Sequence, residues 1–294
     1  MSAPRKNKRD KSGKYLYAVM AGSEERNYGP IGVEGSHVYS MPVGGVAAIV
    51  SDLGNGKIRP ERRNLAAHRD VLNRLMRDST VLPISFGVIG DSRQAVQNIL
   101  AMNKESLTFQ LHRLANKVEM GLHVTWDVPN IFEYFVLTHP ELRAARDRIM
   151  GARGEPAHDE KLQLGHLFER VLNEDREVFM GKVEECLSAH CSEIKRNPCR
   201  DLLEVMNLAC LINRGEQGAF ESGVLQAAGL FDNNFSFDYN GPWAPHNFVD
   251  VDLNLSRESM ESIVSRRRYI VGAGSRHSLD LSRDPQRRPT RVCQ

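Results

Sequence analysis

The sequence predicts an α+β protein of two domains, and three observations carry that prediction. The chain has 294 residues, enough for two domains that each bury a core. Strand-like alternation and helix-like spacing of apolar residues follow one another along it. From Val118 onward the elements run strand, long helical insert, strand, strand, helix, strand. This is the ferredoxin-like β-α-β-β-α-β order, so we expect a small mixed α/β domain followed by a modified ferredoxin-like domain.

The N-terminal domain is expected over residues 14–116. The predicted strands are Tyr15–Met20, a hairpin at His37–Ser51, and Val81–Ile84. A helix is predicted over Glu61–Asp78, where apolar residues recur at the spacing of one helical face: Leu65, Val71, Leu72, Leu75 and Met76. From Val96 to Val118 the apolar positions step by 4, 7, 4, 3 and 4, which indicates one long helix or two helices separated near Asn103.

The C-terminal domain is expected over residues 117–255. Alternation from Val118 to Trp126 predicts a strand with one buried face. The nearly continuous apolar run Leu202–Ile212 is typical of a strand in the centre of a sheet. The other elements are expected as helices over Pro140–Met150, Leu162–Leu187 and Gly218–Leu230, and as strands over Cys191–Asn197 and Phe235–Tyr239.

After Tyr239 the pattern changes. Pro242 and Pro245 both lack the N–H that a central ladder needs. The Gly-Pro-Trp segment is therefore expected to leave the sheet edge and cross the surface of the second domain. Trp243 and Phe248 then have two interpretations, a cap over that domain's core or a patch that contacts a partner. The pattern alone leaves both open.

The net charge of +2 conceals an uneven distribution. Residues 1–14 hold six Lys or Arg and one Asp, and residues 257–294 hold nine Arg and four acidic residues. This leaves 24 basic against 32 acidic residues in the rest of the chain. We expect residues 1–13 to be a disordered basic tail and residues 256–294 to be a basic, flexible extension around an acidic body.

Nothing in the sequence indicates an enzyme. It contains no GxSxG or HExxH motif, and no GxGxxG follows a strand. The five cysteines form no CxxC pair, and the spacing of Cys186, His190, Cys191 and Cys199 matches no usual zinc pattern. No run of about 18 apolar residues is present. We therefore expect a cytoplasmic protein without catalytic residues, cofactor, metal, small-molecule substrate or membrane span.

Nucleic-acid binding through the Arg-rich tails is the alternative function. Ferredoxin-like domains that bind RNA display aromatic residues on their central strands. The predicted central strand, Leu202–Ile212, has neither an aromatic residue nor an arginine. The acidic body would also repel phosphate. These two observations argue against this alternative.

Five separated segments carry a family resemblance. They are KYLYAVMAG from Lys14, GGVAAIVSDL from Gly44, VLPISFGVI from Val81, KVEMGLHVTWD from Lys117 and FDYNGPWAPHNFV from Phe237. In this order they resemble the gas vesicle protein F/L family, over about residues 14–249. Most of the resemblance comes from the motif residues, which are also the candidate partner contacts: Pro83, Phe86, Gly87, Gly241, Pro242, Trp243 and Phe248.

The resemblance implies an accessory or minor structural protein of gas vesicles, the gas-filled, protein-walled compartments that provide buoyancy. It implies the same two-domain α+β fold, no catalysis and no cofactor. The implied partners are the small hydrophobic shell protein and other accessory proteins, and the implied locations are the gas vesicle and the cytoplasm. An assembly factor of this kind makes physical sense, because a shell subunit with a large apolar face aggregates unless that face is covered.

The chain departs from the family pattern at three positions. Ser85 stands where the family usually has Arg, and Ala244 and His246 stand where it usually has Pro and Tyr. All three lie within candidate surfaces. They suggest a divergent paralogue whose partner differs from that of the best-known members.

Overall fold

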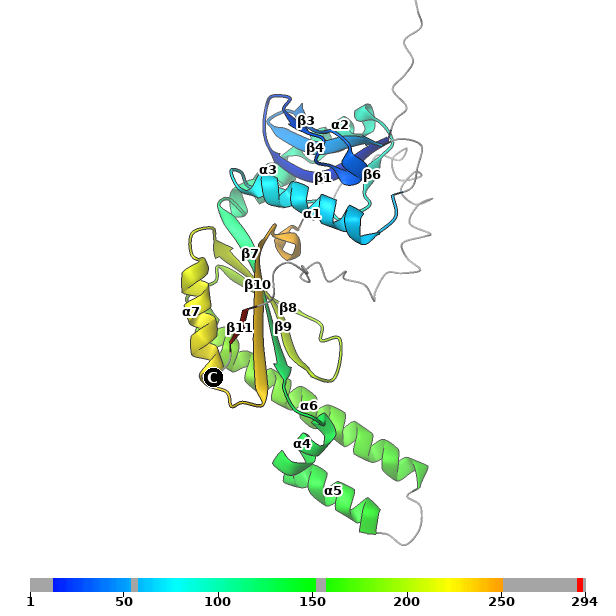
Figure 1. The fold of residues 1–294 in the computed structure, drawn as a ribbon, viewed down its shortest axis with the longest axis vertical. Coiled ribbons are helices and arrows are strands. Elements are labelled where there is room, and N and C mark those ends of the chain that lie inside the picture. Colours follow the sequence, from blue (N-terminus) through cyan, green and yellow to red (C-terminus); the bar gives the residue numbers. More distant parts are fainter. Residues whose placement is uncertain (1–12, 54–57, 152–156, 251–289, 293–294) are drawn as a thin grey trace, which may run out of the picture. The chain divides into compact units, whose positions relative to one another are not determined.

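The computed structural model describes residues 13–53, 58–151, 157–250 and 290–292, which fall into two compact units (Figure 1). Unit 1 comprises Met1–Glu119 and Trp243–Asp284, and unit 2 comprises Met120–Pro242 and Pro285–Gln294. The expected basic tail and most of the expected C-terminal extension lie outside the described residues.

Unit 1 is built on an antiparallel sheet with β1 (Gly13–Ala21) near its centre. The other strands are β2 (Asn27–Gly29), β3 (Val38–Val43), β4 (Val46–Leu53), β5 (Val81–Pro83) and β6 (Ile89–Gly90). The order is β2-β3-β4-β1-β5, and β6 also pairs with β1. The register between β1 and β4 shifts between Leu16 and Ala18, which leaves Tyr17 as the extra residue of a bulge. Tyr15 and Tyr17 are both fully buried.

Three α-helices of the described residues complete the core of unit 1. They are α1 (Arg62–Met76), α2 (Arg93–Met102) and α3 (Lys104–Arg113), accompanied by the short turns η1 (Val33–Gly35) and η2 (His246–Phe248). The predicted helical face after Val96 is two helices, since Asn103 ends α2 and begins α3. The Asn103 side-chain amide donates to the Ile99 carbonyl at 2.8 Å, a side-chain bond that competes with continuation of the helix.

Unit 2 contains the second sheet. Its strands are β7 (Lys117–Trp126), β8 (Glu193–Asn197), β9 (Glu204–Asn213), β10 (Phe235–Trp243) and β11 (Thr290–Val292), in the order β11-β10-β7-β9-β8. The first three residues of β7, up to Glu119, and the last residue of β10, Trp243, are grouped with unit 1. Its helices are α4 (Ile131–Thr138), α5 (Pro140–Gly151), α6 (His158–Leu187) and α7 (Gln217–Ala228). Strand β9 is inside the sheet and buried along nearly its whole length, as its apolar run predicts. Helices α6 and α7 pack against each other and against β9 (Figure 1).

The structure adds one helix to the second half of the chain, α4, which was not predicted, and it corrects two expectations. Strand β10 does not end at Tyr239 but continues through Gly241-Pro242 to Trp243. A proline is tolerated there because β11 pairs only with Phe237–Tyr239, so no strand of the described structure pairs with the outer side of β10 at Pro242. Finally, the described residues after Pro242, up to Asp250, group with unit 1 and not with the second domain.

Candidate functional site

A buried chain of hydrogen bonds joins β1, α1 and the loop after β5 in unit 1. The Tyr15 hydroxyl lies 2.9 Å from Nδ1 of His68, and His68 Nε2 lies 3.0 Å from the Ile84 carbonyl oxygen. A carbonyl only accepts, so Nε2 carries the proton and Nδ1 accepts from Tyr15. The Gly87 amide donates to the same tyrosine oxygen at 3.2 Å. Both ring nitrogens of His68 are therefore satisfied, as expected for a histidine that is structural.

Burial determines the protonation states of Tyr15 and His68 in this hydrogen-bonded network. It lowers the pKa of His68 to about 4, with the nearby His246 as a further cause and the hydrogen bond to Ile84 opposing the shift. Burial also raises the pKa of Tyr15 above its ordinary value. Near neutral pH both side chains are uncharged. The hydrogen-bonded network thus holds these backbone segments in place without a buried charge.

The first family motif surrounds this hydrogen-bonded chain. Pro83 ends β5 opposite Ala18 of β1. The Phe86 ring makes edge contacts with Tyr15 and His68, with centroids 6.0 and 5.8 Å apart. Gly87 has φ +87°, a conformation that favours glycine, and it presents its amide to Tyr15. These three motif residues therefore have a packing or backbone role in unit 1.

The second family motif is divided between the two units. Gly241 and Pro242 lie in β10 of unit 2, whereas Trp243 and Phe248 belong to unit 1. The Arg69 guanidinium carbon lies 5.9 Å from the Trp243 ring centroid, a cation–π arrangement. Phe248 is fully buried. Since His68 of α1 contacts Phe86 and its neighbour Arg69 contacts Trp243, α1 brings the unit 1 parts of both motifs together.

The segment from Trp243 to Asp250 is fastened to unit 1 by polar contacts as well. The buried Glu119 carboxylate accepts from the Asn247 backbone amide at 2.9 Å and from its side-chain amide at 2.6 Å. Gln110 donates to the Asp250 carbonyl at 2.7 Å, and Arg113 donates to the Phe248 carbonyl. Burial of Phe248 and these contacts favour the cap interpretation of the segment, with unit 1 as the part that it caps.

The three departures from the family pattern occupy different environments. Ser85 is exposed in the loop after β5. Ala244 is almost completely buried, at 3% exposure. His246 is partly buried, and burial lowers its pKa to about 4. Of the three positions, only Ser85 is on the open surface.

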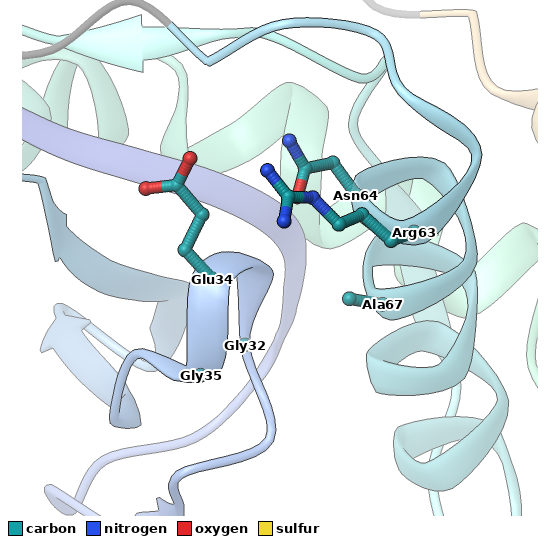
Figure 2. Close-up of a pocket in the computed structure, with 6 residues that line it drawn as sticks. All are labelled: Gly32, Glu34, Gly35, Arg63, Asn64 and Ala67. Carbon is teal, nitrogen blue, oxygen red and sulfur yellow. The ribbon is translucent and has the colours of Figure 1, made fainter.

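A pocket of about 500 Å³ lies between η1 and the first turns of α1. Its lining residues are Gly32, Glu34, Gly35, Arg63, Asn64 and Ala67. Figure 2 shows the Glu34 carboxylate on η1 and the Arg63 and Asn64 side chains on α1 at opposite walls of this space. Arg63 also pairs with Glu61 at 2.9 Å, and the Asn64 amide donates to the Arg59 carbonyl at 3.0 Å. Each of these two side chains thus has a partner within the chain.

The η1 wall of the pocket is held by the buried core. The Val33 amide donates to the Tyr17 hydroxyl at 2.9 Å, and that hydroxyl also bonds to Ser51 at 3.0 Å. A Cβ at Gly32 would lie 2.5 Å from the Tyr17 oxygen, so only glycine fits this close approach. The pocket wall therefore contacts Tyr17, and the first family motif contacts Tyr15, which are two buried tyrosines of β1.

In the described ranges, no three or more His, Cys, Asp or Glu side chains are grouped to hold a metal ion. None of the helices described is both long enough and apolar enough to cross a membrane.

Tyr15, His68, Arg69 and Glu119 were not among the predicted site residues. A signal for His68 exists in the sequence, because it precedes Val71, Leu72 and Leu75 by three, four and seven residues and so shares their helical face. The Glu119–Asn247 contact joins residues 128 positions apart. No local pattern indicates a pair so distant.

The fold and the site define an α+β protein with two sheets, whose motif residues in unit 1 pack around α1. A family model described as gas vesicle synthesis protein GvpL/GvpF matches residues 13–250. The chain therefore belongs to the GvpL/GvpF family of gas vesicle proteins.

Individual relatives agree with this assignment. The chain is 27% identical over 241 residues to gas vesicle protein F of Streptomyces sp. (strain CB03234), covering 80% of this chain and 99% of that protein. It is 26% identical to gas vesicle protein F of Nostoc sp. (strain PCC 7120 / SAG 25.82 / UTEX 2576), covering 82% and 99%. The crystal structure of GvpF from Anabaena sp. PCC7120 matches with TM-score 0.72 and 25% identity, over 82% of this chain and 99% of that one.

Proposed function

We propose that this chain assists gas vesicle assembly by binding the small hydrophobic shell protein together with other accessory proteins. Membership of the GvpL/GvpF family supports a gas vesicle role. The proposal involves no catalytic step, cofactor or small-molecule substrate. It places the chain in the cytoplasm during assembly and on the gas vesicle if it is retained.

The observation that carries shell-protein binding is the exposed apolar surface of the helical insert in unit 2. Helices α4 and α5 lie beside the N-terminal part of α6 (Figure 1). Four large apolar side chains on these helices are 40–77% exposed: Phe132, Leu137, Met150 and Leu162. Exposed apolar surface is a feature of protein interaction sites, and we take these four side chains as the candidate contact surface, although others such as Phe109 on α3 are exposed as well. We propose that these side chains pack against the apolar face of a shell subunit, because that face aggregates unless it is covered before assembly.

We also propose that unit 2 is a ferredoxin-like domain in which these helices are the insert. The chain order β7, α4–α6, β8, β9, α7, β10 and the sheet order β10-β7-β9-β8 support that proposal.

A binding experiment tests the proposed function. Leu137 and Met150, 61% and 77% exposed, are replaced together by Glu (L137E/M150E), and the matched control is Leu225→Glu on α7, where the side chain is 51% exposed. The double variant should retain the thermal unfolding temperature of the wild type but lose at least ten-fold in affinity for the solubilised shell protein. The control should bind normally. Equal affinity of all three proteins would refute binding through the insert.

Flotation distinguishes a chain that stays in the vesicle wall from an assembly factor that leaves. Vesicles are isolated by flotation, washed with urea and probed for this chain. A chain that stays with the vesicles is a minor wall component, and a chain found only in the soluble fraction is an assembly factor that leaves.

A further inference from the structure

Helix α1 and the residues next to it hold a concentration of positive charge that the rest of the protein body lacks. Between residues 59 and 77 the sequence has six arginines and only two acidic residues, Glu61 and Asp70. Outside the terminal segments 1–14 and 257–294, these are six of 24 basic residues, against 32 acidic ones. This part of unit 1 is therefore a basic region in an otherwise acidic body.

The arginines of α1 lie mostly on the side of the helix that faces away from the core. The buried side carries residues such as His68 and Leu75. Arg62, Arg63 and Arg74 are exposed, and the Arg63 side chain is 75% accessible. In the described part of the chain, neither Arg62 nor Arg74 has an ion-pair partner. The exposed face of α1 therefore presents cations to the surroundings of the protein.

Two of these arginines occupy positions that a helix does not favour. Arg62 and Arg63 are the first two residues of α1, whose first turn contains no acidic residue and whose N-cap residue, Glu61, makes no side-chain capping bond. A positive charge near the start of a helix is unfavourable, because the backbone dipole is positive there too. Arg74, in the last turn, does complement the dipole. The stability of the helix therefore accounts for Arg74 but not for the first two arginines.

A pocket adjoins this basic face. The space of about 500 Å³ between η1 and α1 has Arg63 on its α1 wall and the exposed Glu34 carboxylate on its η1 wall (Figure 2). Gly32 and Gly35 present no side chains to it, and the small Ala67 lies between the charged groups and the middle of α1. The pocket thus has room for a side chain from another molecule, with groups of both signs at its walls.

The pattern of charges favours a protein as the partner of this face. Glu61 and Asp70 lie among the arginines, and the body around them is acidic, so an unbroken row of phosphates would meet repulsion. A protein segment rich in Asp and Glu can place carboxylates opposite the arginines alone. We propose that the exposed face of α1, with Arg62, Arg63 and Arg74 as its cations and the pocket beside it, docks an acidic segment of a partner protein. This inference does not depend on the proposed function, which assigns the shell protein to unit 2.

Photo-cross-linking in the full-length chain tests this docking. The probe is a short poly-L-glutamate peptide that carries a photoreactive group, and mass spectrometry maps the residues that it labels at low ionic strength. Arg62→Glu with Arg63→Glu (R62E/R63E) is the test variant. Its new acidic residues stand in the first turn of α1, where the dipole favours them, so the thermal unfolding temperature should not fall. The control is Lys161→Glu with Arg170→Glu, which reverses two exposed charges on α6.

The wild type and the control should be labelled within residues 59–77, and R62E/R63E should lose this labelling about ten-fold or more. Labelling of the basic terminal segments should be the same in all three proteins and serves as the internal reference. Labelling confined to those segments, or equal labelling of α1 in R62E/R63E, would refute the docking face. Displacement of the peptide from α1 by an oligothymidylate at a lower concentration than by unlabelled poly-L-glutamate would overturn the protein partner in favour of nucleic acid.

Discussion

The hydroxyl of Tyr15 donates a hydrogen bond to Nδ1 of His68 across 2.9 Å and so joins the central strand of unit 1 to helix α1. The same oxygen accepts from the amide of Gly87. One buried hydroxyl therefore links Gly87 of the first family motif to strand β1 and helix α1.

Tyr15→Phe is expected to destabilise unit 1 by about 1–3 kcal/mol, because it leaves the buried Nδ1 of His68 and the Gly87 amide without this partner. Urea unfolding monitored by circular dichroism measures the change. Tyr28→Phe is the matched control, since the Tyr28 hydroxyl has only a weak contact with the Met20 sulfur at 4.0 Å. Equal stability of the two variants would contradict a structural role for the Tyr15 hydroxyl.

Unit 1 should lose stability as the pH falls from about 6.5 to about 4. Burial lowers the pKa of His68 and of His246 to about 4, whereas unfolded histidine titrates near 6.5. Protons therefore bind the unfolded chain first, and stability is complete above about pH 6.5. Between pH 7 and 5, where few carboxylates titrate, the loss should be about 1–2 kcal/mol for His68 and less for the partly exposed His246.

Urea unfolding at pH 7, 6 and 5 measures this loss, and His246→Asn should make the pH dependence shallower. An unfolding free energy that is constant across this range would show that these histidines are not buried in the neutral form.

Trp243→Ala should destabilise unit 1 and leave unit 2 folded, because Trp243 belongs to unit 1 and lies over Arg69. Loss of a partly buried aromatic ring and of a cation–π contact should cost about 1–3 kcal/mol. Hydrogen exchange read separately over α1 and over β9 localises the effect. Faster exchange in β9 alone would instead support a cap over the second domain.

Glu119→Ala should release the segment Trp243–Asp250 from unit 1. It removes the carboxylate that accepts two hydrogen bonds from Asn247, a loss of about 1–3 kcal/mol. Limited proteolysis should then cut this segment several-fold faster than in the wild type. Glu105→Ala is the control, because Glu105 is exposed in the first turn of α3. A cutting rate that matches this control would mean that Glu119 does not hold the segment.

Elements with a strong local pattern could be predicted from the sequence. The apolar run of β9 predicted a central strand, and the alternation from Val118 to Trp126 predicted β7. Helix α4 was missed because its eight residues are too few for a clear helical period. Its start signal was nevertheless present, since the Asn130 side chain accepts from the amides of Phe132 and Glu133.

The site was less accessible to prediction than the fold. Family motifs located Phe86 and Trp243 but gave no indication that α1 joins them through His68 and Arg69. Trp243 to Asp250 was assigned to the second domain because its chain neighbours are there. Its actual position depends on contacts such as Glu119 with Asn247, which tertiary packing decides.

We propose above that the chain assists gas vesicle assembly by binding the shell protein through the α4–α6 insert. The most direct measurement counts buoyant vesicles in a strain that lacks the gene and carries either the wild type, L137E/M150E or L225E. We expect few vesicles without the gene, recovery with the wild type and L225E, and no recovery with L137E/M150E. Normal vesicle numbers in the deletion strain, or full recovery with L137E/M150E, would contradict it.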